Sequence, residues 1–113
     1  MDKKRIVLVG GLAPSMFEGF RELTIWYKRI SVEELVELVK RAGEVLNYVR
    51  HESTVRLLSQ VLERDLTPNA GLYKWAEGDE LIIVGLKKPI RGQEVQVSAE
   101  DLDLIYCRIF PGH

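Results

Sequence analysis

Ile6-Val7-Leu8-Val9, followed directly by Gly10-Gly11, is the segment from which the architecture follows most directly. A continuous run of β-branched and leucine side chains is typical of a strand buried inside a sheet. The glycines end this strand, and residues 10–15 are predicted to form a loop. Because glycine lets a ligand approach the backbone closely, this loop is a candidate binding element. A plain turn explains the glycines at least as well, since the GxGxxG spacing of a dinucleotide-binding loop is missing.

Apolar patterns on either side of this segment predict the remaining elements. Strands are predicted over residues 22–30, 72–75, 80–86 and 104–110, and a short apolar segment covers 45–49. Helices are predicted to begin after residue 31 and around residue 52, and one helical turn is predicted at 98–101. Ser31 and Glu34 form a capping box that begins the first helix, and Gly43 is predicted to end it. Strands and helices mix without a regular βαβ cycle. We therefore predict one α/β (α+β) domain spanning residues 1–113, with a mixed sheet of about five strands flanked by helices.

Composition excludes several classes of protein. Of 113 residues, 46% are hydrophobic and 29% are charged, a globular balance, and the net charge of −1 gives no global field for duplex DNA. Cys107, the single cysteine, is expected to pack inside a strand, and no Cys/His cluster has zinc-ligand spacing, so no metal or cofactor is expected. No apolar run suits a signal peptide or a membrane span, which indicates an intracellular, cytoplasmic protein without a membrane partner.

His51 is the only internal histidine, and it stands directly before a predicted helix. A helix start presents unpaired backbone N–H groups and the positive end of the dipole, which suit a phosphate. The hydroxyls of Ser53 and Thr54 add donors at the same place. A histidine here can reach a phosphate oxygen or a leaving-group oxygen. Alternatively, His51 and Ser53 only cap the helix, and the local pattern leaves both interpretations open.

Two further features are compatible with an anionic or nucleotide ligand. Lys87, Lys88 and Arg91 gather three cations in one turn, which is either an anion contact or a solvated hairpin tip. Trp26 and Trp75 are able to stack on bases, although tryptophans on predicted strands are more often core or interface residues. From these patterns alone, the chain has a possible anion site and no assigned chemistry.

The tetrad His51-Glu52-Ser53-Thr54 carries a more specific resemblance. Together with Ile30-Ser31-Val32-Glu33-Glu34-Leu35 before it and Gly78-Asp79-Glu80-Leu81 after it, it resembles the small viral and prokaryotic family whose characterised members are type III CRISPR ring nucleases. Viral anti-CRISPR proteins are among them. The resemblance covers nearly the whole chain. It implies a homodimer that encloses cyclic tetra-adenylate in a pocket across its two-fold axis, cleaves this cyclic oligoadenylate without metal, and so removes the signal that activates CRISPR effector nucleases.

The resemblance also implies roles for individual residues. His51 is the expected general acid, and Lys88 is expected to assist catalysis from the charged turn. The expected ligand-binding residues come from the first loop, the helix start and the turn: Gly10, Gly11, Leu12, Ala13, Ser15, Ser53, Thr54, Lys87, Arg91 and Gly92. In such a site the ribose 2′-hydroxyl attacks the adjacent phosphate in line, and the products are linear oligoadenylates ending in 2′,3′-cyclic phosphate.

The chain departs from the family pattern at several of these positions. Lys88 replaces a common arginine, which keeps the charge but loses the planar fork that grips a phosphate. Arg91 replaces an acid, and Ala70 replaces an arginine that follows an asparagine. These changes leave two alternatives to a ring nuclease: a sponge or sensor that binds a cyclic oligonucleotide without turnover, or an interaction protein with no nucleotide ligand.

Overall fold

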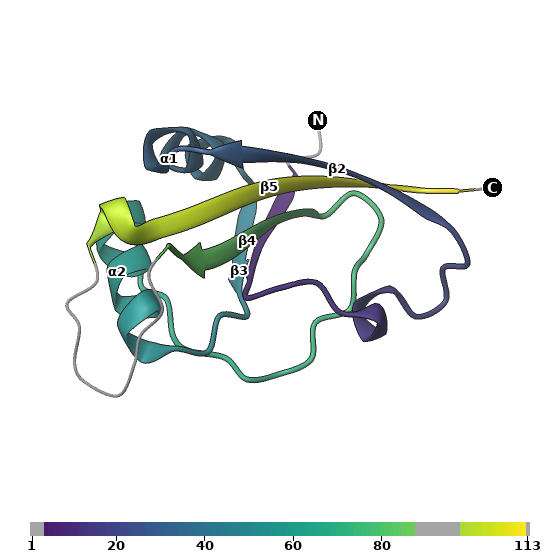
Figure 1. Cartoon of the computed structure of the whole chain (residues 1–113), viewed down its shortest axis with the longest axis horizontal. Coiled ribbons are helices and arrows are strands. Elements are labelled where there is room, and N and C mark those ends of the chain that lie inside the picture. The colour runs from purple at the N-terminus through teal and green to yellow at the C-terminus, as the bar shows by residue number, and fades with distance from the viewer. Residues whose placement is uncertain (1–3, 88–97, 113) are drawn as a thin grey trace.

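One mixed sheet with strand order β2-β5-β4-β1-β3 forms the centre of the chain, in a computed structural model that describes residues 4–87 and 98–112 (Figure 1). The strands are β1 (Arg5–Val9), β2 (Leu23–Ile30), β3 (Glu44–Asn47), β4 (Glu80–Leu86) and β5 (Leu102–Pro111). The helices are α1 (Val32–Arg41), α2 (Glu52–Leu62) and two short 3-10 turns, η1 (Pro14–Phe17) and η2 (Ala99–Asp101). The predicted fold class, a five-stranded mixed sheet with helices, is confirmed.

The sheet is mixed because its two halves run differently. β1 pairs in parallel with both β3 and β4, whereas β5 is antiparallel to β4 and to the edge strand β2. The three parallel strands therefore end at the same edge of the sheet. This edge matters for function, because ligands of open α/β sheets bind outside the carboxyl ends of the strands.

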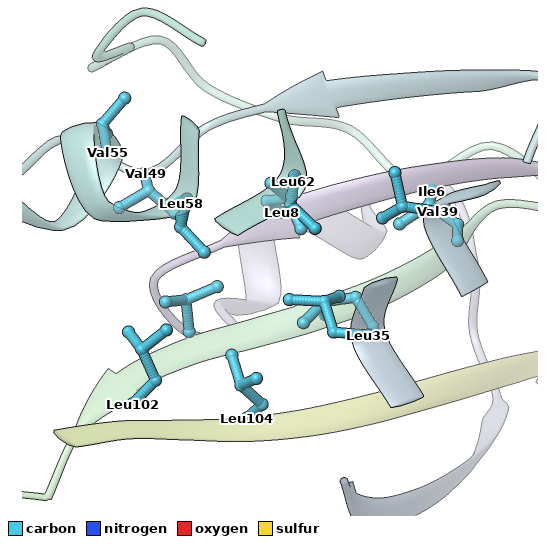
Figure 2. Close-up of a cluster of buried hydrophobic side chains, with 12 residues drawn as sticks. Ile6, Leu8, Leu35, Val39, Val49, Val55, Leu58, Leu62, Leu102 and Leu104 are labelled. Atoms are coloured by element: carbon cyan, nitrogen blue, oxygen red, sulfur yellow. The ribbon is translucent and has the colours of Figure 1, made fainter. Parts of the chain in front are cut away.

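Both helices cover one face of the sheet. α1 contributes Leu35 and Val39, and α2 contributes Val55, Leu58 and Leu62, all of which are buried. Figure 2 shows these side chains gathered with residues of the strands: Ile6, Leu8, Leu102 and Leu104. The helical apolar stripes expected from the sequence are thus the stripes that face the core.

Loops rather than helices cover the opposite face. Val7 and Val9 of β1 alternate with the residues that face the helices, and they pack in a second cluster with Met16, Tyr73 and Trp75 from two loops. Cys107 of β5 is fully buried in the same cluster, as the sequence predicts. Successive side chains of β1 point to opposite faces of the sheet. Helices bury the side chains on one face, and loops bury those on the other.

The start of α1 is as predicted, but its end is not. The Ser31 hydroxyl accepts a hydrogen bond from the Glu34 backbone at 3.1 Å, and the Glu34 carboxylate accepts one from the Ser31 backbone at 3.1 Å. The helix ends at Arg41 with Ala42 as its C-cap, in an extended conformation. Gly43 does not cap the helix. Its N–H donates to the Lys4 carbonyl at 2.9 Å, so the glycine already leads into the pairing of β3 with β1.

The strand predicted over residues 72–75 is wrong. This segment is an extended loop whose alternating pattern has another cause: Tyr73 and Trp75 are buried against the sheet face, while Leu72 is exposed. The Trp75 backbone N–H donates a hydrogen bond to the Met16 carbonyl at 2.7 Å. The segment is therefore attached to the first loop and not to a neighbouring strand. Trp26 does lie on β2, but it is 46% exposed and is not a core residue.

Candidate functional site

A cavity of about 610 Å³ opens at the carboxyl ends of β1, β3 and β4. Its walls are the last residues of β1 and β4, the first loop, the connection from β3 to the start of α2, and the segment 70–73. The volume falls in the range of roughly 300–1,000 Å³ that is usual for small-ligand sites. The sheet topology thus creates a hollow where segments far apart in the sequence meet.

Most of the predicted first-loop and helix-start residues lie on this cavity. The predicted residues that line it are Gly10, Gly11, Leu12, Ala13, Ser15, His51 and Thr54. Thr54 is only 3% exposed, so it forms part of the inner wall, whereas His51 is exposed at the surface of the hollow. A glycine loop and a helix start, separated by about forty positions in the sequence, therefore face one space.

His51 is the N-cap residue of α2, but its side chain does not cap the helix. Its backbone is extended, and its carbonyl accepts the first helical hydrogen bond from the Val55 N–H at 2.9 Å. Within residues 4–87 and 98–112, no hydrogen bond or ion pair engages the imidazole. The ring is therefore free to contact a ligand beside the unpaired N–H groups of the first helical turn.

The charge of the cavity suits an anion. Among the described residues that line it, no aspartate or glutamate is present, and Arg50 is the one arginine or lysine. Arg50 directly precedes His51 and is exposed. The chain as a whole has a net charge of −1. The described lining of this hollow, which lacks carboxylates, therefore differs in electrostatic character from the chain as a whole.

Several predicted site residues lie elsewhere or outside the described residues. Ser53 is exposed on the first turn of α2 and is not part of the cavity lining. Lys87 follows β4 at the surface, where its N–H donates to the Asp101 carbonyl at 2.8 Å, and it does not line the cavity either. Lys88, Arg91 and Gly92 lie outside the described residues.

Tyr48, Arg50, Leu72 and Tyr73 line the cavity and were not singled out as site residues from the sequence. The Tyr48 and Tyr73 rings lie side by side, with centroids 5.2 Å apart. The nearness of Tyr48 and Arg50 to His51 in sequence was a usable signal, because residues next to a helix start share its surroundings. No local signal placed Leu72 or Tyr73 there, since they arrive from a distant loop.

The buried carboxylates lie at the amino ends of β1 and β4, away from the cavity. Asp79 accepts two hydrogen bonds from Arg5, at 2.9 and 2.6 Å, and one from the Tyr73 hydroxyl at 2.6 Å. Burial raises the pKa of Tyr73, and its hydrogen bond to Asp79 raises it further. Glu80 contacts Lys4 at 3.0 Å and Arg108 at 3.5 Å. Both acids are paired, and their contacts fasten strands together.

In the part of the chain that the structure describes, no three histidine, cysteine, aspartate or glutamate side chains are grouped so that they could hold a metal ion. Over the same residues, none of the helices is long and apolar enough to cross a membrane.

Comparisons with known proteins assign the chain to a family. A search of curated proteins gave no match. Among solved structures, the chain is similar to B116 of Sulfolobus turreted icosahedral virus (STIV), with a TM-score of 0.71 and 20% sequence identity over 91% of this chain and 97% of that one. This likeness shows the fold. The profile of the STIV B116-like family matches residues 7–109, nearly the full length of the 113-residue chain. The protein therefore belongs to the STIV B116-like family.

Proposed function

We propose that this protein is a metal-independent ring nuclease, which binds and cleaves cyclic tetra-adenylate and so switches off or evades type III CRISPR defence. The observation that carries the proposal is the position of His51. Its imidazole stands at the start of α2 in a cavity whose lining includes a glycine loop. Among the described residues, the imidazole has no partner and no carboxylate lines the cavity. The likeness of the His51-Glu52-Ser53-Thr54 tetrad to type III CRISPR ring nucleases supports the same chemistry.

The proposed reaction needs little from the protein besides positioning and a proton. The ribose 2′-oxygen attacks the adjacent phosphorus, the bond from phosphorus to the 5′-oxygen breaks, and the 2′-hydroxyl proton passes to solvent. The protonated His51 ring donates a proton to the departing 5′-oxygen. The N–H groups at the start of α2 and the Arg50 guanidinium stabilise the negative charge of the transition state. The products are linear oligoadenylates with a 2′,3′-cyclic phosphate and a 5′-hydroxyl.

A second candidate function, a sponge or sensor that binds the ring without turnover, is favoured by one observation. Ala70 lines the cavity at the position where the resemblance leads one to expect an arginine, so this wall contributes no charge to the transition state. Binding depends less on such a charge than cleavage does, because negative charge on the phosphate oxygens grows only as the 2′-oxygen attacks the phosphorus.

A single assay tests these functions. The protein is incubated with cyclic tetra-adenylate and, separately, cyclic hexa-adenylate in the presence of a chelator, and the products are separated by chromatography. We expect wild-type protein to produce linear oligoadenylates from the tetra-adenylate. The His51→Ala variant is expected to lose at least about 100-fold in rate, the range of a general acid, while it still binds the ring. His113→Ala, which removes the other histidine of the chain, is the matched control and is expected to cleave normally.

The outcomes separate the possible functions. Cleavage that is unchanged in His51→Ala would contradict the proposed role of that residue. Tight binding with intact ring recovered after long incubation would favour the sponge. A wild-type protein that binds neither ring would leave the third class, an interaction protein without a nucleotide ligand.

A further inference from the structure

Two asparagines join the segment that carries His51 to the loop that forms a neighbouring wall of the cavity. Asn47 is the last residue of β3, and Asn69 lies in the loop that follows α2. Residues 48–51 and 70–73, which directly follow these asparagines, all line the cavity. Each asparagine therefore directly precedes a segment that lines the cavity, and neither asparagine lines the cavity itself.

The hydrogen bonds between the two segments use both side-chain donors of Asn47 and one of Asn69. The Asn47 side-chain N–H₂ donates to the Thr67 carbonyl at 2.7 Å and to the Val49 carbonyl at 3.2 Å, and its oxygen accepts from the Val49 N–H at 3.1 Å. The Asn69 side-chain N–H₂ donates to the Asn47 carbonyl at 3.1 Å, and the Asn69 backbone N–H donates to the Val49 carbonyl at 3.1 Å. An amide has two donors and one acceptor oxygen, so no shorter side chain reproduces this pattern.

Gly71 completes the junction from the other side. Its N–H donates to the Asn69 side-chain oxygen at 2.8 Å. A Cβ atom added at this glycine would lie 2.9 Å from the same oxygen. A side chain at residue 71 fits only if the Asn69 amide moves, so a larger residue at this position disturbs the junction through Asn69.

Val49 shows how the junction reaches the site. Its side chain is 3% exposed in the core cluster on the helical face of the sheet, and its backbone N–H and carbonyl are both held by the asparagines. His51 follows only two residues later and begins α2. With the Val49 backbone fixed on one side and α2 packed on the sheet on the other, the position of the imidazole relative to the cavity is restricted.

We propose that Asn47, Asn69 and Gly71 act as a positioning clamp, which sets where His51 stands in the cavity. The inference rests on the proposed ring-nuclease function for its kinetic readout. Asn47 and Asn69 are positioning residues and touch no substrate. A displacement of about 1 Å at a reacting group can cost about 100-fold in rate, so the clamp is expected to act on the chemical step and much less on ligand affinity.

Asn69→Asp is the sharpest test. It keeps the oxygen that accepts from Gly71, and it replaces the donor to the Asn47 carbonyl with an oxygen. Thr67→Ala is the matched control, because Thr67 contributes only its carbonyl to the clamp. We expect Asn69→Asp to lower kcat about 10- to 100-fold with KM changed less than about threefold, and Thr67→Ala to change neither. Asn69→Ala, which removes the amide without a new charge, is expected to behave like Asn69→Asp and serves if that variant does not fold.

A double variant shows whether the effect passes through His51. If the clamp positions the imidazole, adding Asn69→Asp to His51→Ala slows the residual single-turnover cleavage no further. An equal rate loss in the wild-type and His51→Ala backgrounds would overturn the clamp, and so would a change in KM alone. If wild-type protein cleaves no ring, the proposed function fails and the clamp is judged separately by NMR. The clamp then predicts that the His51 imidazole resonance shifts in Asn69→Asp but not in Thr67→Ala. A resonance that is unmoved in both variants would overturn the clamp.

Discussion

Asp79 illustrates how single polar residues are tolerated inside this protein. It is 6% exposed, yet its carboxylate meets the Arg5 guanidinium through two hydrogen bonds and the Tyr73 hydroxyl through a third. Its carbonyl also accepts from the Trp75 indole at 3.0 Å. A buried carboxylate is stable only with such partners. These contacts also attach the 70–79 segment, and with it one wall of the cavity, to the amino end of β1.

Tyr73→Phe removes the hydroxyl partner of Asp79 and preserves the ring that packs on the sheet. Because hydrogen bonds to charged groups are worth about 1.5–3 kcal/mol, we expect the free energy of unfolding to fall by about this amount in urea titrations. Tyr27→Phe is the control, since Tyr27 is 65% exposed, and it should change stability by less than about 0.5 kcal/mol. Equal losses in the two variants would show that the buried hydrogen bond contributes nothing particular.

α1 owes its first turn to a reciprocal pair of hydrogen bonds between Ser31 and Glu34. The hydrogen bond from the Ser31 backbone is the main reason that the pKa of Glu34 is lowered, and the charge of Lys28 adds to it. The last turn carries Lys40 and Arg41, which complement the negative end of the helix dipole. Glu33 and Glu34 do the same at the positive end. The residues at both ends of α1 therefore favour the helix, through the capping box at its start and through charges that complement the dipole.

The capping box gives α1 a stability that depends on pH. Ser31→Ala should lower the free energy of unfolding by about 1 kcal/mol at neutral pH. Since the pKa of Glu34 is lower in the folded protein, the contribution of its carboxylate is present above the unfolded value of about 4.3. It is lost as pH falls through the lowered folded value. Thermal melts of wild type and Glu34→Gln should therefore differ at pH 7 and converge in acid, and a difference that grew in acid would contradict this assignment.

Across the whole molecule, the two faces of the sheet differ in how they are covered. Helices bury one face, whereas loops bury only part of the other. The edge strand β2 has few buried positions, and large apolar side chains of β2 and β5 are exposed: Ile25, Trp26, Tyr27 and Phe110. Ile25 and Tyr27 lie on the loop-covered face, whereas Trp26 lies beside Tyr106 on the helical face, so the exposed side chains flank the sheet edge on both faces. Exposed apolar side chains at a sheet edge often mark an interaction surface. Such a surface suits the homodimer that the resemblance to type III CRISPR ring nucleases implies.

The homodimer is tested by the mass in solution. The chain has a mass of 13.0 kDa, and we expect light scattering coupled to size-exclusion chromatography to give twice that value at micromolar concentration. Tyr27→Glu places a charge on the exposed edge strand β2 and is expected to shift the equilibrium toward the monomer if β2 takes part. Wild-type protein that remains monomeric at every concentration would contradict a pocket shared by two copies.

Local patterns were sufficient for much of the secondary structure. The apolar run of β1, the capping box of α1, the stripe of α2 and the run of β4 each depend on residues a few positions apart, so short-range interactions already specify them. The position of His51 at a helix start was predictable for the same reason, because the start of a helix, with its unpaired N–H groups, depends on neighbouring residues. The glycines after β1 were recognisable as a loop on the same grounds.

Contacts between distant residues determined the rest. The alternation of residues 72–75 predicted a strand, but these side chains cover a sheet face because Asp79 and Met16 hold the segment there. The bond between Asn69 and Asn47 spans 22 positions, and the cavity exists only because parallel pairing brings the ends of β1, β3 and β4 to one edge. No short stretch of sequence encodes such meetings, since their energy arises only when the chain closes its long loops.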